Sequence, residues 1–229
     1  MTKKGITVAL AGNPNSGKTT VFNNITGARQ HVGNWPGVTV EKKEGTCRFK
    51  GITLRIVDLP GVYSLTAYSM DEVVARDYIV DENPDVVVDI VDASNLERNL
   101  YLAVQLLEMR VKLVIGLNMM DVAESRGYKI DIEKLSSLLG VPVVPLVAAR
   151  NEGTQELLQT VFDVAEKTIA VDGIHLQYGR DVEAEIDKLE KIIVDKLPVD
   201  RYSPRWLAVK LLEEDEEIIG KIRQAQVVW

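Results

Sequence analysis

The chain has 229 residues, of which 46% are hydrophobic and 27% charged, and its formal net charge is −7. This length allows one medium domain and a smaller one, and the acidic balance argues against nucleic acid as a partner. No apolar run approaches the ~20 residues of a membrane span. The single cysteine, Cys47, cannot form an internal disulfide, and the N-terminus has no signal-peptide pattern. We expect a soluble, cytoplasmic chain, which still allows it to be a piece of a longer membrane protein.

Up to residue 168, strand-like apolar runs alternate with helix-like segments. The runs typical of strands are 6–11, 38–49, 52–58, 86–91, 113–117 and 141–146, and the segments typical of helices are 18–25, 100–107 and 154–168. The second and third runs predict a hairpin that turns at Lys50-Gly51, and the fourth and fifth are apolar throughout, as in buried parallel strands. The pattern predicts an α/β domain over residues 1–169, with a mostly parallel sheet, one antiparallel strand and helices on both faces.

The strand signal stops after residue 169, and residues 170–229 are predicted to form a small all-helical domain. Apolar residues at helical spacing are Val182, Ile186, Leu189, Ile193 and Leu197. Leu197-Pro198 is expected to end this helix, and Ser203-Pro204 to open another as N-cap and first helical residue. A last short helix is expected around residues 218–222.

A phosphate-binding loop is predicted between the first strand and the first helix, where residues 12–19 match G-x-x-x-x-G-K-[ST] in full. Glycines allow successive backbone N–H groups to point at phosphate oxygens. Lys18 would place its charge on the β and γ phosphates, and the Thr19 hydroxyl would ligate Mg2+. The residues expected to contact nucleotide here are Gly12, Asn13, Pro14, Asn15, Ser16, Gly17, Lys18, Thr19 and Thr20.

Two further segments are predicted to sense the metal and the γ-phosphate. Asp58-Leu59-Pro60-Gly61 follows a strand, so that Asp58 can reach Mg2+ through water and the Gly61 N–H can approach the γ-phosphate. Thr39 lies between the first helix and the next strand, where its hydroxyl can close over Mg2+ when γ-phosphate is present. We interpret residues 27–38 as a mobile switch loop, and expect loops 27–40 and 58–70 to change with nucleotide state.

Base recognition is predicted at the ends of two later strands. Asp121, in Asn118-Met119-Met120-Asp121, can accept hydrogen bonds from guanine N1–H and the exocyclic amino group, a donor pair that adenine lacks. Met119 replaces the lysine of the usual N-K-x-D pattern, so that its thioether would pack on the ring. Val147-Ala148-Ala149 resembles a guanine loop only weakly, with the Ala148 N–H as the expected donor to the guanine oxygen.

These five motifs in this order predict a Ras-like P-loop GTPase fold, and the details resemble the N-terminal cytoplasmic region of the ferrous-iron transport protein B family. The stretches that carry the resemblance are 12–19, 33–41, 58–65, 118–121 and 201–208. The resemblance implies a GTP-binding domain and a helical domain that favours bound GDP. It also implies a C-terminal transmembrane iron-permease domain as partner, small cytoplasmic accessory proteins, and a place on the cytoplasmic face of the cell membrane. The oligomeric state is left open, with a homo-oligomer among the alternatives.

Catalysis is expected to be slow, because the position after D-x-x-G is Val62 and not a water-orienting glutamine. The Asn15 amide oxygen could hold a monovalent cation beside the phosphates, and the family resembled includes members that K+ activates in this way. The alternative is that Asn15 only bonds to backbone. The residues expected to carry the reaction are Lys18, Asn15, Thr39 and Gly61.

Two other functions remain alternatives on sequence grounds. One is a soluble ribosome-assembly or RNA-modification GTPase, against which thirteen acidic and nine basic residues from Asp172 onward argue. The other is a nucleotide-gated binding module with negligible hydrolysis. No iron site is expected in this chain, because His31, His175 and Cys47 are far apart in the sequence.

Overall fold

The computed structural model describes residues 5–171, 176–196 and 202–227, without the side chains of 224–227. The chain divides into two compact units, residues 1–107 with 111–174 and residues 175–229 with 108–110. This division falls a few residues after the predicted boundary between 169 and 170, which stays a prediction. Residues discussed above that lie outside the described parts are 1–4, Asp172, His175, Leu197-Pro198 and Arg201.

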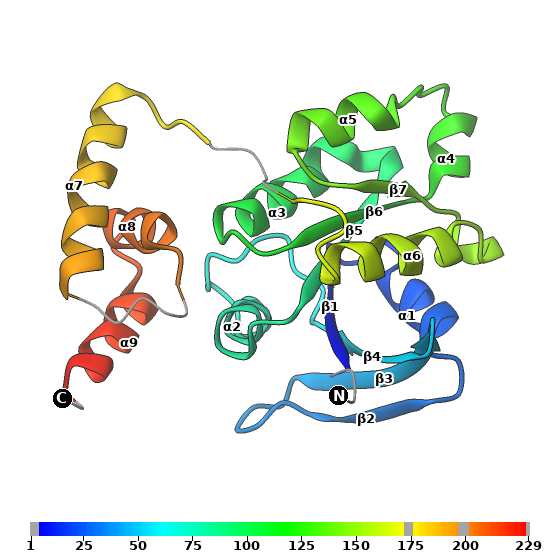
Figure 1. Cartoon of the computed structure of the whole chain (residues 1–229), viewed down its shortest axis with the longest axis horizontal. Coiled ribbons are helices and arrows are strands. Elements are labelled where there is room, and N and C mark those ends of the chain that lie inside the picture. The colour runs from blue at the N-terminus through cyan, green and yellow to red at the C-terminus, as the bar shows by residue number, and fades with distance from the viewer. Residues whose placement is uncertain (1–4, 172–175, 197–201, 228–229) are drawn as a thin grey trace. The chain divides into compact units, whose positions relative to one another are not determined.

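The first unit is built on a seven-stranded sheet with the order β2-β3-β4-β1-β5-β6-β7 (Figure 1). The strands are β1 (Ile6–Gly12), β2 (Gln30–Asn34), β3 (Glu41–Phe49), β4 (Ile52–Asp58), β5 (Val86–Asp92), β6 (Leu113–Asn118) and β7 (Val143–Pro145). Strand β3 runs antiparallel to both of its neighbours, and the remaining pairs are parallel. The prediction of a mostly parallel sheet with one antiparallel strand is therefore confirmed.

Helices cover both faces of this sheet. They are α1 (Lys18–Thr26), α2 (Met70–Asp77), α3 (Leu96–Glu108), α4 (Met120–Ser125), α5 (Ile132–Leu139) and α6 (Thr154–Ala165), with short turns η1 (Tyr78–Glu82), η2 (Ala93–Asn95) and η3 (Ala148–Arg150). Apolar side chains of α1 and α6, such as Phe22 and Val161, share one buried cluster with Leu10 and Ile90 of the central strands. Helices α2 and α3 lie on the other side of the strands (Figure 1). Burial of both faces explains why β5 and β6 are apolar almost throughout.

The register of the central strands brings the sequence motifs to one edge of the sheet. Leu10 pairs with Asp58, Gly12 with Ile90, and Asp92 with Asn118, so that β1, β4, β5 and β6 end side by side. In parallel sheets, ligands bind outside the carboxyl ends of the strands. The fold therefore places the phosphate loop, Asp58 and the segment 118–121 on a common edge.

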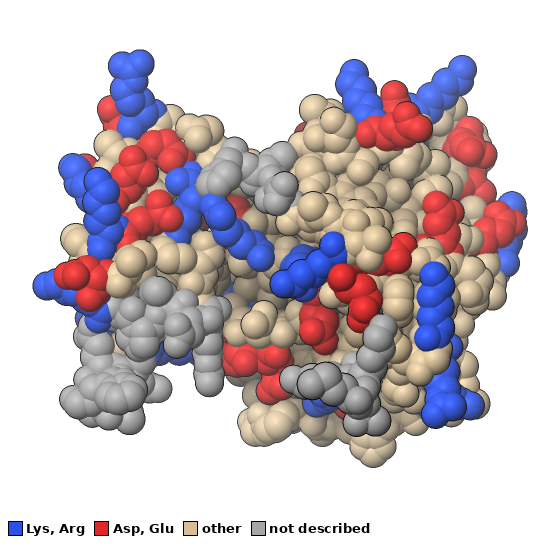
Figure 2. Space-filling model, viewed as in Figure 1, with Lys and Arg blue, Asp and Glu red and all other residues tan. Residues whose placement is uncertain are grey.

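The second unit is helical in its described residues, with α7 (Arg180–Lys196), α8 (Pro204–Leu212) and α9 (Glu216–Val227). Ser203 caps α8 and Pro204 is its first residue, as predicted. Ile186 and Ile193, one face of the predicted apolar stripe, are buried. No helix within the described ranges is long and apolar enough to cross a membrane. On the face shown in Figure 2, acidic and basic side chains are interspersed.

Several elements differ from the sequence prediction. Residues 27–38 are not entirely a loop, because β2 pairs with β3 as an edge strand, and β3 begins at Glu41 rather than at Val38. Every residue of β2 is exposed, so the strand is held by backbone hydrogen bonds and leaves no apolar pattern in the sequence. Helices α2, α4 and α5 were also not predicted.

Candidate nucleotide-binding site

The phosphate loop connects β1 to α1 through backbone conformations that its glycines allow. Gly17, directly before α1, has a φ of 88°, and a Cβ atom there would lie 2.2 Å from the Asn118 side-chain nitrogen. Asn15 is also left-handed, with a φ of 66°, and its side chain is exposed. Only glycine fits at position 17, since both the dihedral angle and the neighbouring amide exclude a side chain.

Buried polar atoms gather in this loop. Within the described residues, the Ser16 hydroxyl and both side-chain amide atoms of Asn13 are buried without a hydrogen-bond partner. Unpaired buried polar groups are unfavourable and mark places where a polar ligand can compensate. The loop opens a helix N-terminus, where phosphate groups bind readily. These features fit a nucleotide phosphate chain with its Mg2+.

Lys18 and Asp58 form a buried ion pair at the centre of this edge. The Lys18 ammonium donates to the Asp58 carboxylate and to the backbone carbonyl of Leu59. Burial raises the pKa of Asp58, and the neighbouring ammonium of Lys18 partly offsets this effect. The structure thus joins the residue predicted to contact the β and γ phosphates to the residue predicted to reach Mg2+, while Thr19 and Thr20 are exposed beside them.

The segment after Asp58 lies against the phosphate loop. The Leu59 N–H donates to Leu10 and the Val62 N–H to Gly12, at 3.0 and 3.2 Å. A Cβ atom on Gly61 would lie 3.4 Å from Pro14 backbone atoms. This close approach places the Gly61 backbone beside the loop, which agrees with its expected role near the γ-phosphate.

Asn118 connects three segments that are distant in the sequence. Its amide nitrogen donates to the Ser16 carbonyl and its oxygen accepts from the Ala148 N–H, both at 2.9 Å. The Ala148 N–H, predicted to donate to the guanine oxygen, is therefore bonded to Asn118 in the structure. Asn24 of α1 donates to the Ala148 carbonyl at 2.8 Å. The predicted guanine loop, residues 147–149 and called the base loop, is thereby attached to the phosphate loop. Val147 is buried and Ala149 is exposed.

Asp121 has a partner that the sequence analysis missed. One carboxylate oxygen accepts from the Val122 N–H at 2.9 Å, and the other lies 3.3 Å from the Arg150 guanidinium. The two residues follow different strands, β6 and β7, which pair side by side. The signal that could have indicated Arg150 is its cationic side chain directly after the predicted guanine loop. Met119 adopts a left-handed φ of 60° before α4.

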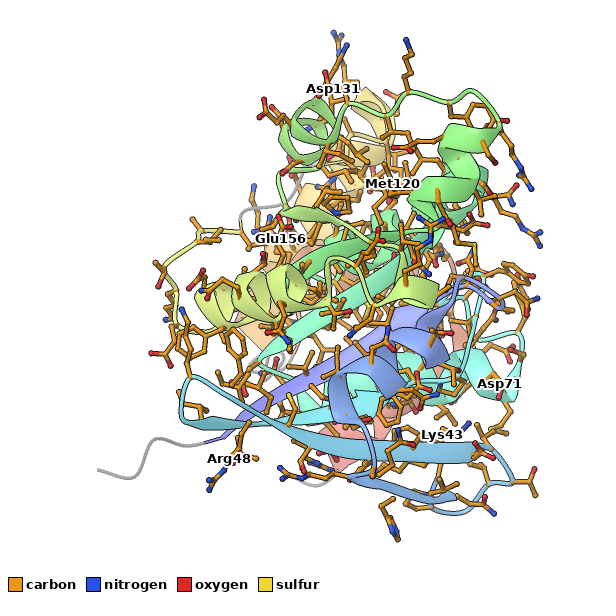
Figure 3. The ribbon with its side chains drawn as sticks, turned by 90° about the vertical axis from the view of Figure 1, so that its right-hand side faces the viewer. Lys43, Arg48, Asp71, Met120, Asp131 and Glu156 are labelled. Carbon is orange, nitrogen blue, oxygen red and sulfur yellow. The ribbon has the colours of Figure 1, made fainter. Side chains whose placement is uncertain are left out.

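Thr39 lies apart from these residues. It is exposed in the turn between β2 and β3, and no hydrogen bond among the described residues joins it to Thr19 or Asp58. Figure 3 shows Lys43 of β3 and Met120 of α4 on either side of α1, so the switch hairpin (β2 and β3, residues 30–49) and the base-reading segment (residues 118–121) flank this helix. The structure brings together every other predicted site segment.

The described residues contain no candidate iron site. No group of three or more His, Cys, Asp or Glu in the described part of the chain could hold a metal ion. His31 is exposed on β2, and burial raises the pKa of the Cys47 thiol. The expectation that this region has no iron site stays a prediction.

Comparisons with known proteins agree with the geometry. A family model described as Ferrous iron transport protein B matches residues 6–161, and one described as FeoB cytosolic helical domain matches residues 178–228. The Fe(2+) transporter FeoB of Shigella flexneri is 46% identical over 216 residues, which are 93% of this chain and 27% of that protein. The chain thus spans about a quarter of the length of such curated relatives.

Two solved structures extend this likeness to the whole described fold. The cytosolic domain of the T. maritima FeoB iron transporter in a GDP form has a TM-score of 0.90 and 42% identity, covering 97% of this chain and 87% of that one. Its GMPPNP form has a TM-score of 0.89 and 42% identity, covering 96% and 86%. The first unit therefore has a P-loop GTPase fold, and the chain belongs to the ferrous iron transport protein B family.

Proposed function

We propose that this chain is the GTP-binding region, on the cytoplasmic face of the membrane, of a ferrous-iron transporter. It binds GTP and GDP with Mg2+, hydrolyses GTP slowly, and regulates iron uptake through the nucleotide state of loops 27–40 and 58–70. The observation that carries this proposal is the buried Lys18–Asp58 pair beneath a phosphate loop whose Ser16 and Asn13 polar atoms are unpaired. The family and the GDP and GMPPNP forms of its relatives support it.

The chain's own residues account for nucleotide binding. The Lys18 ammonium exchanges the Asp58 carboxylate for phosphate oxygens, since both are anionic partners of the same donor. Backbone N–H groups of residues 13–18 and the start of α1 bind the phosphates. The Thr19 and Thr39 hydroxyls and, through water, Asp58 would hold Mg2+, which would neutralise charge on the phosphates. Asp121 selects guanine by accepting from its N1–H and amino group.

Slow hydrolysis follows from the residue after Gly61. Val62 is buried, 4% exposed, and its side chain can neither donate nor accept a hydrogen bond to orient water. Asn15 is the candidate cation ligand, because it is exposed at the loop and makes no side-chain hydrogen bond within the described residues. Under this proposal K+ at Asn15 raises the rate. No side chain of the site is assigned as general base.

The remainder of the transporter completes the function. Curated relatives are longer proteins named as Fe(2+) transporters, so a C-terminal membrane domain is the proposed partner of this chain. Residues 1–169 form the proposed GTP-binding domain, and residues 170–229 a helical domain that favours bound GDP. Accessory cytoplasmic proteins and self-association are further proposed partners.

Phosphate release from GTP with Mg2+, in KCl and in NaCl at equal ionic strength, tests this proposal. We expect slow release that rises in KCl for the wild type and does not rise in Asn15→Ala. Equal rates in both salts would contradict the cation role but keep the GTPase. Release at background level in both salts, with GTP still bound, would support the nucleotide-gated module instead. The variant Lys18→Ala provides the background, since it removes the phosphate-binding charge.

A further inference from the structure

Trp35, at the end of β2, occupies a seat made by α2, η1 and β3. Its side chain is 9% exposed, although every residue of β2 itself is exposed. The indole ring meets the Tyr78 ring edge to face, with 5.3 Å between centroids and 67° between planes. The Lys42 ammonium lies 4.8 Å from the indole centroid. Such aromatic and cation–π contacts add to the burial of the ring.

Trp35 also fixes the turn that carries Thr39. The Val38 N–H donates to the Trp35 carbonyl at 3.3 Å, and the Trp35 N–H donates to Val40 at 2.9 Å. Pro36 and Gly37, with a Gly37 φ of 76°, occupy the central positions of a type II turn. These bonds connect the Trp35 backbone with the residues on both sides of Thr39, so the position of Trp35 and that of Thr39 are linked through the turn.

The seat contains features that weaken it. In the described part of the chain, the Trp35 indole nitrogen and the Tyr78 hydroxyl are buried without hydrogen-bond partners. Burial raises the pKa of Tyr78 to about 12, so its hydroxyl stays protonated and keeps an unused donor. A surface pocket of about 370 Å3 borders both rings and is lined also by Met70 and Val73. The two unpaired polar groups lower the cost of moving the indole out of the seat.

The helix beneath the ring is also irregular. Tyr78 begins η1, a π-helical turn that directly continues α2. Such turns occur often at functional sites because they interrupt regular hydrogen bonding. The seat therefore joins the switch hairpin to the helix that follows the other switch loop, residues 58–70.

We propose that Trp35 is a positioning residue that, seated on Tyr78, holds Thr39 away from the metal and the γ-phosphate. Binding of the triphosphate requires the indole to leave this seat, so the seat favours the diphosphate form. This inference rests on the proposed function of the site. The Trp35–Tyr78 contact sets the balance between GDP and GTP binding. Substitutions that remove the Trp35 ring and substitutions that remove only an unpaired polar group should therefore have opposite effects.

The test measures the affinities of the 229-residue chain for fluorescent GDP and fluorescent GMPPNP with Mg2+, as their ratio. Trp35→Ala removes the ring from the seat and should raise the preference for GMPPNP by roughly fivefold. Tyr78→Phe keeps the ring but removes one unpaired polar group, so it should lower this preference by about threefold. Phe49→Leu, which disturbs the separate Phe49–Phe162 pair, should leave the ratio unchanged.

The outcomes separate this inference from the function beneath it. Shifts in opposite directions for Trp35→Ala and Tyr78→Phe support the positioning role of Trp35, because a merely structural role would change both affinities together. An unchanged ratio in both variants, or equal loss of both affinities, overturns this positioning role alone. Failure of the wild type to bind either nucleotide overturns the proposed function, and the positioning role with it. Since Tyr78→Phe removes one atom only, it keeps the test valid if Trp35→Ala does not fold.

Discussion

The Asn118 amide, which joins the phosphate loop to the base loop, and the Trp35 seat treat their buried polar groups in opposite ways. At the loop edge, Asn118 uses both ends of its amide to join Ser16 and Ala148. In the hairpin seat, the Trp35 nitrogen and the Tyr78 hydroxyl bond to nothing within the described residues. A fully bonded network fixes one arrangement, whereas unpaired groups reduce the free-energy gap to alternatives. The site therefore combines a cradle that Asn118 holds in one arrangement with a hairpin that can change its position.

The largest effect is expected at Gly17, the tightest point of the rigid edge. A methyl group in Gly17→Ala would meet the Asn118 amide at 2.2 Å and hold a φ of 88°, so Asn118 would have to give up its bonds. We expect a loss of about 5 kcal/mol in the free energy of unfolding and of nucleotide affinity by more than about 100-fold.

A matched control separates space from backbone strain. Gly127 also has a positive φ, 82°, close to that of Gly17, but a Cβ atom there meets nothing within 4 Å. Gly127→Ala should lose only about 1 kcal/mol and keep GDP affinity. Equal losses for both variants, measured by urea unfolding and GDP titration, would show that strain and not the Asn118 contact decides the effect.

Asp89 tests whether a buried polar group without a partner lowers the free energy of unfolding of the first unit, which is the effect argued for the Trp35 seat. It lies on β5, 1% exposed, with one carboxylate oxygen unpaired among the described residues, and burial raises its pKa to about 7 from 3.8. The folded carboxyl therefore keeps a proton that the unfolded chain loses, and stability falls as pH rises from about 4 to about 7. Above that range the penalty is on the order of 4 kcal/mol.

The variant Asp89→Asn removes this titration and should be more stable than the wild type at pH 8, with a smaller difference at pH 5. Urea unfolding at both pH values measures the difference, and Asp85→Asn is the control because its carboxylate is exposed and accepts from Thr7. If Asp89→Asn does not gain stability with pH, the carboxyl is compensated in the folded state, and the argument from unpaired groups in the seat loses support.

Asn118→Ala tests the network that makes the loop edge rigid. It leaves the Ser16 carbonyl and the Ala148 N–H without their partner, which should lower the free energy of unfolding by about 3 kcal/mol. GDP should also dissociate faster, because the base loop is no longer attached to the phosphate loop. Asn24→Ala removes one bond to the same base loop and should lose about 1 kcal/mol. Similar losses for both variants would contradict the central place of Asn118.

The sequence predicts the phosphate-loop edge much better than the switch hairpin. The phosphate loop, Asp58 and Asn118 each follow a strongly apolar strand, and parallel pairing brings the ends of such strands together, so local motifs sufficed. The pattern also predicted a boundary between residues 169 and 170, which stays a prediction. The family models distinguish the iron-transport family from the RNA-linked GTPases that the sequence had left open.

The hairpin and its seat could not be predicted in this way. Strand β2 has no apolar alternation because backbone bonds to β3 hold it, and the Trp35–Tyr78 contact joins residues 43 positions apart through tertiary packing. In the sequence, Trp35 belongs to the stretch 33–41, which carries no signal that identifies Tyr78 as its partner. The Pro36-Gly37 turn, by contrast, has a local signal that predicts a type II turn.

The smallest effect is expected at Arg150, on the exposed side of the rigid edge. Its guanidinium lies 3.3 Å from the Asp121 oxygen expected to accept from guanine, and the two side chains are 61% and 33% exposed. Because exposed ion pairs are weak, Arg150→Ala should tighten GDP binding by only about twofold at low salt, by removing a competitor for Asp121. High salt should remove the difference through screening. Arg48→Ala is the charge-matched control, since Arg48 projects from β3 away from α4 (Figure 3). Weaker GDP binding in Arg150→Ala would instead place the guanidinium among the groups that contact the nucleotide.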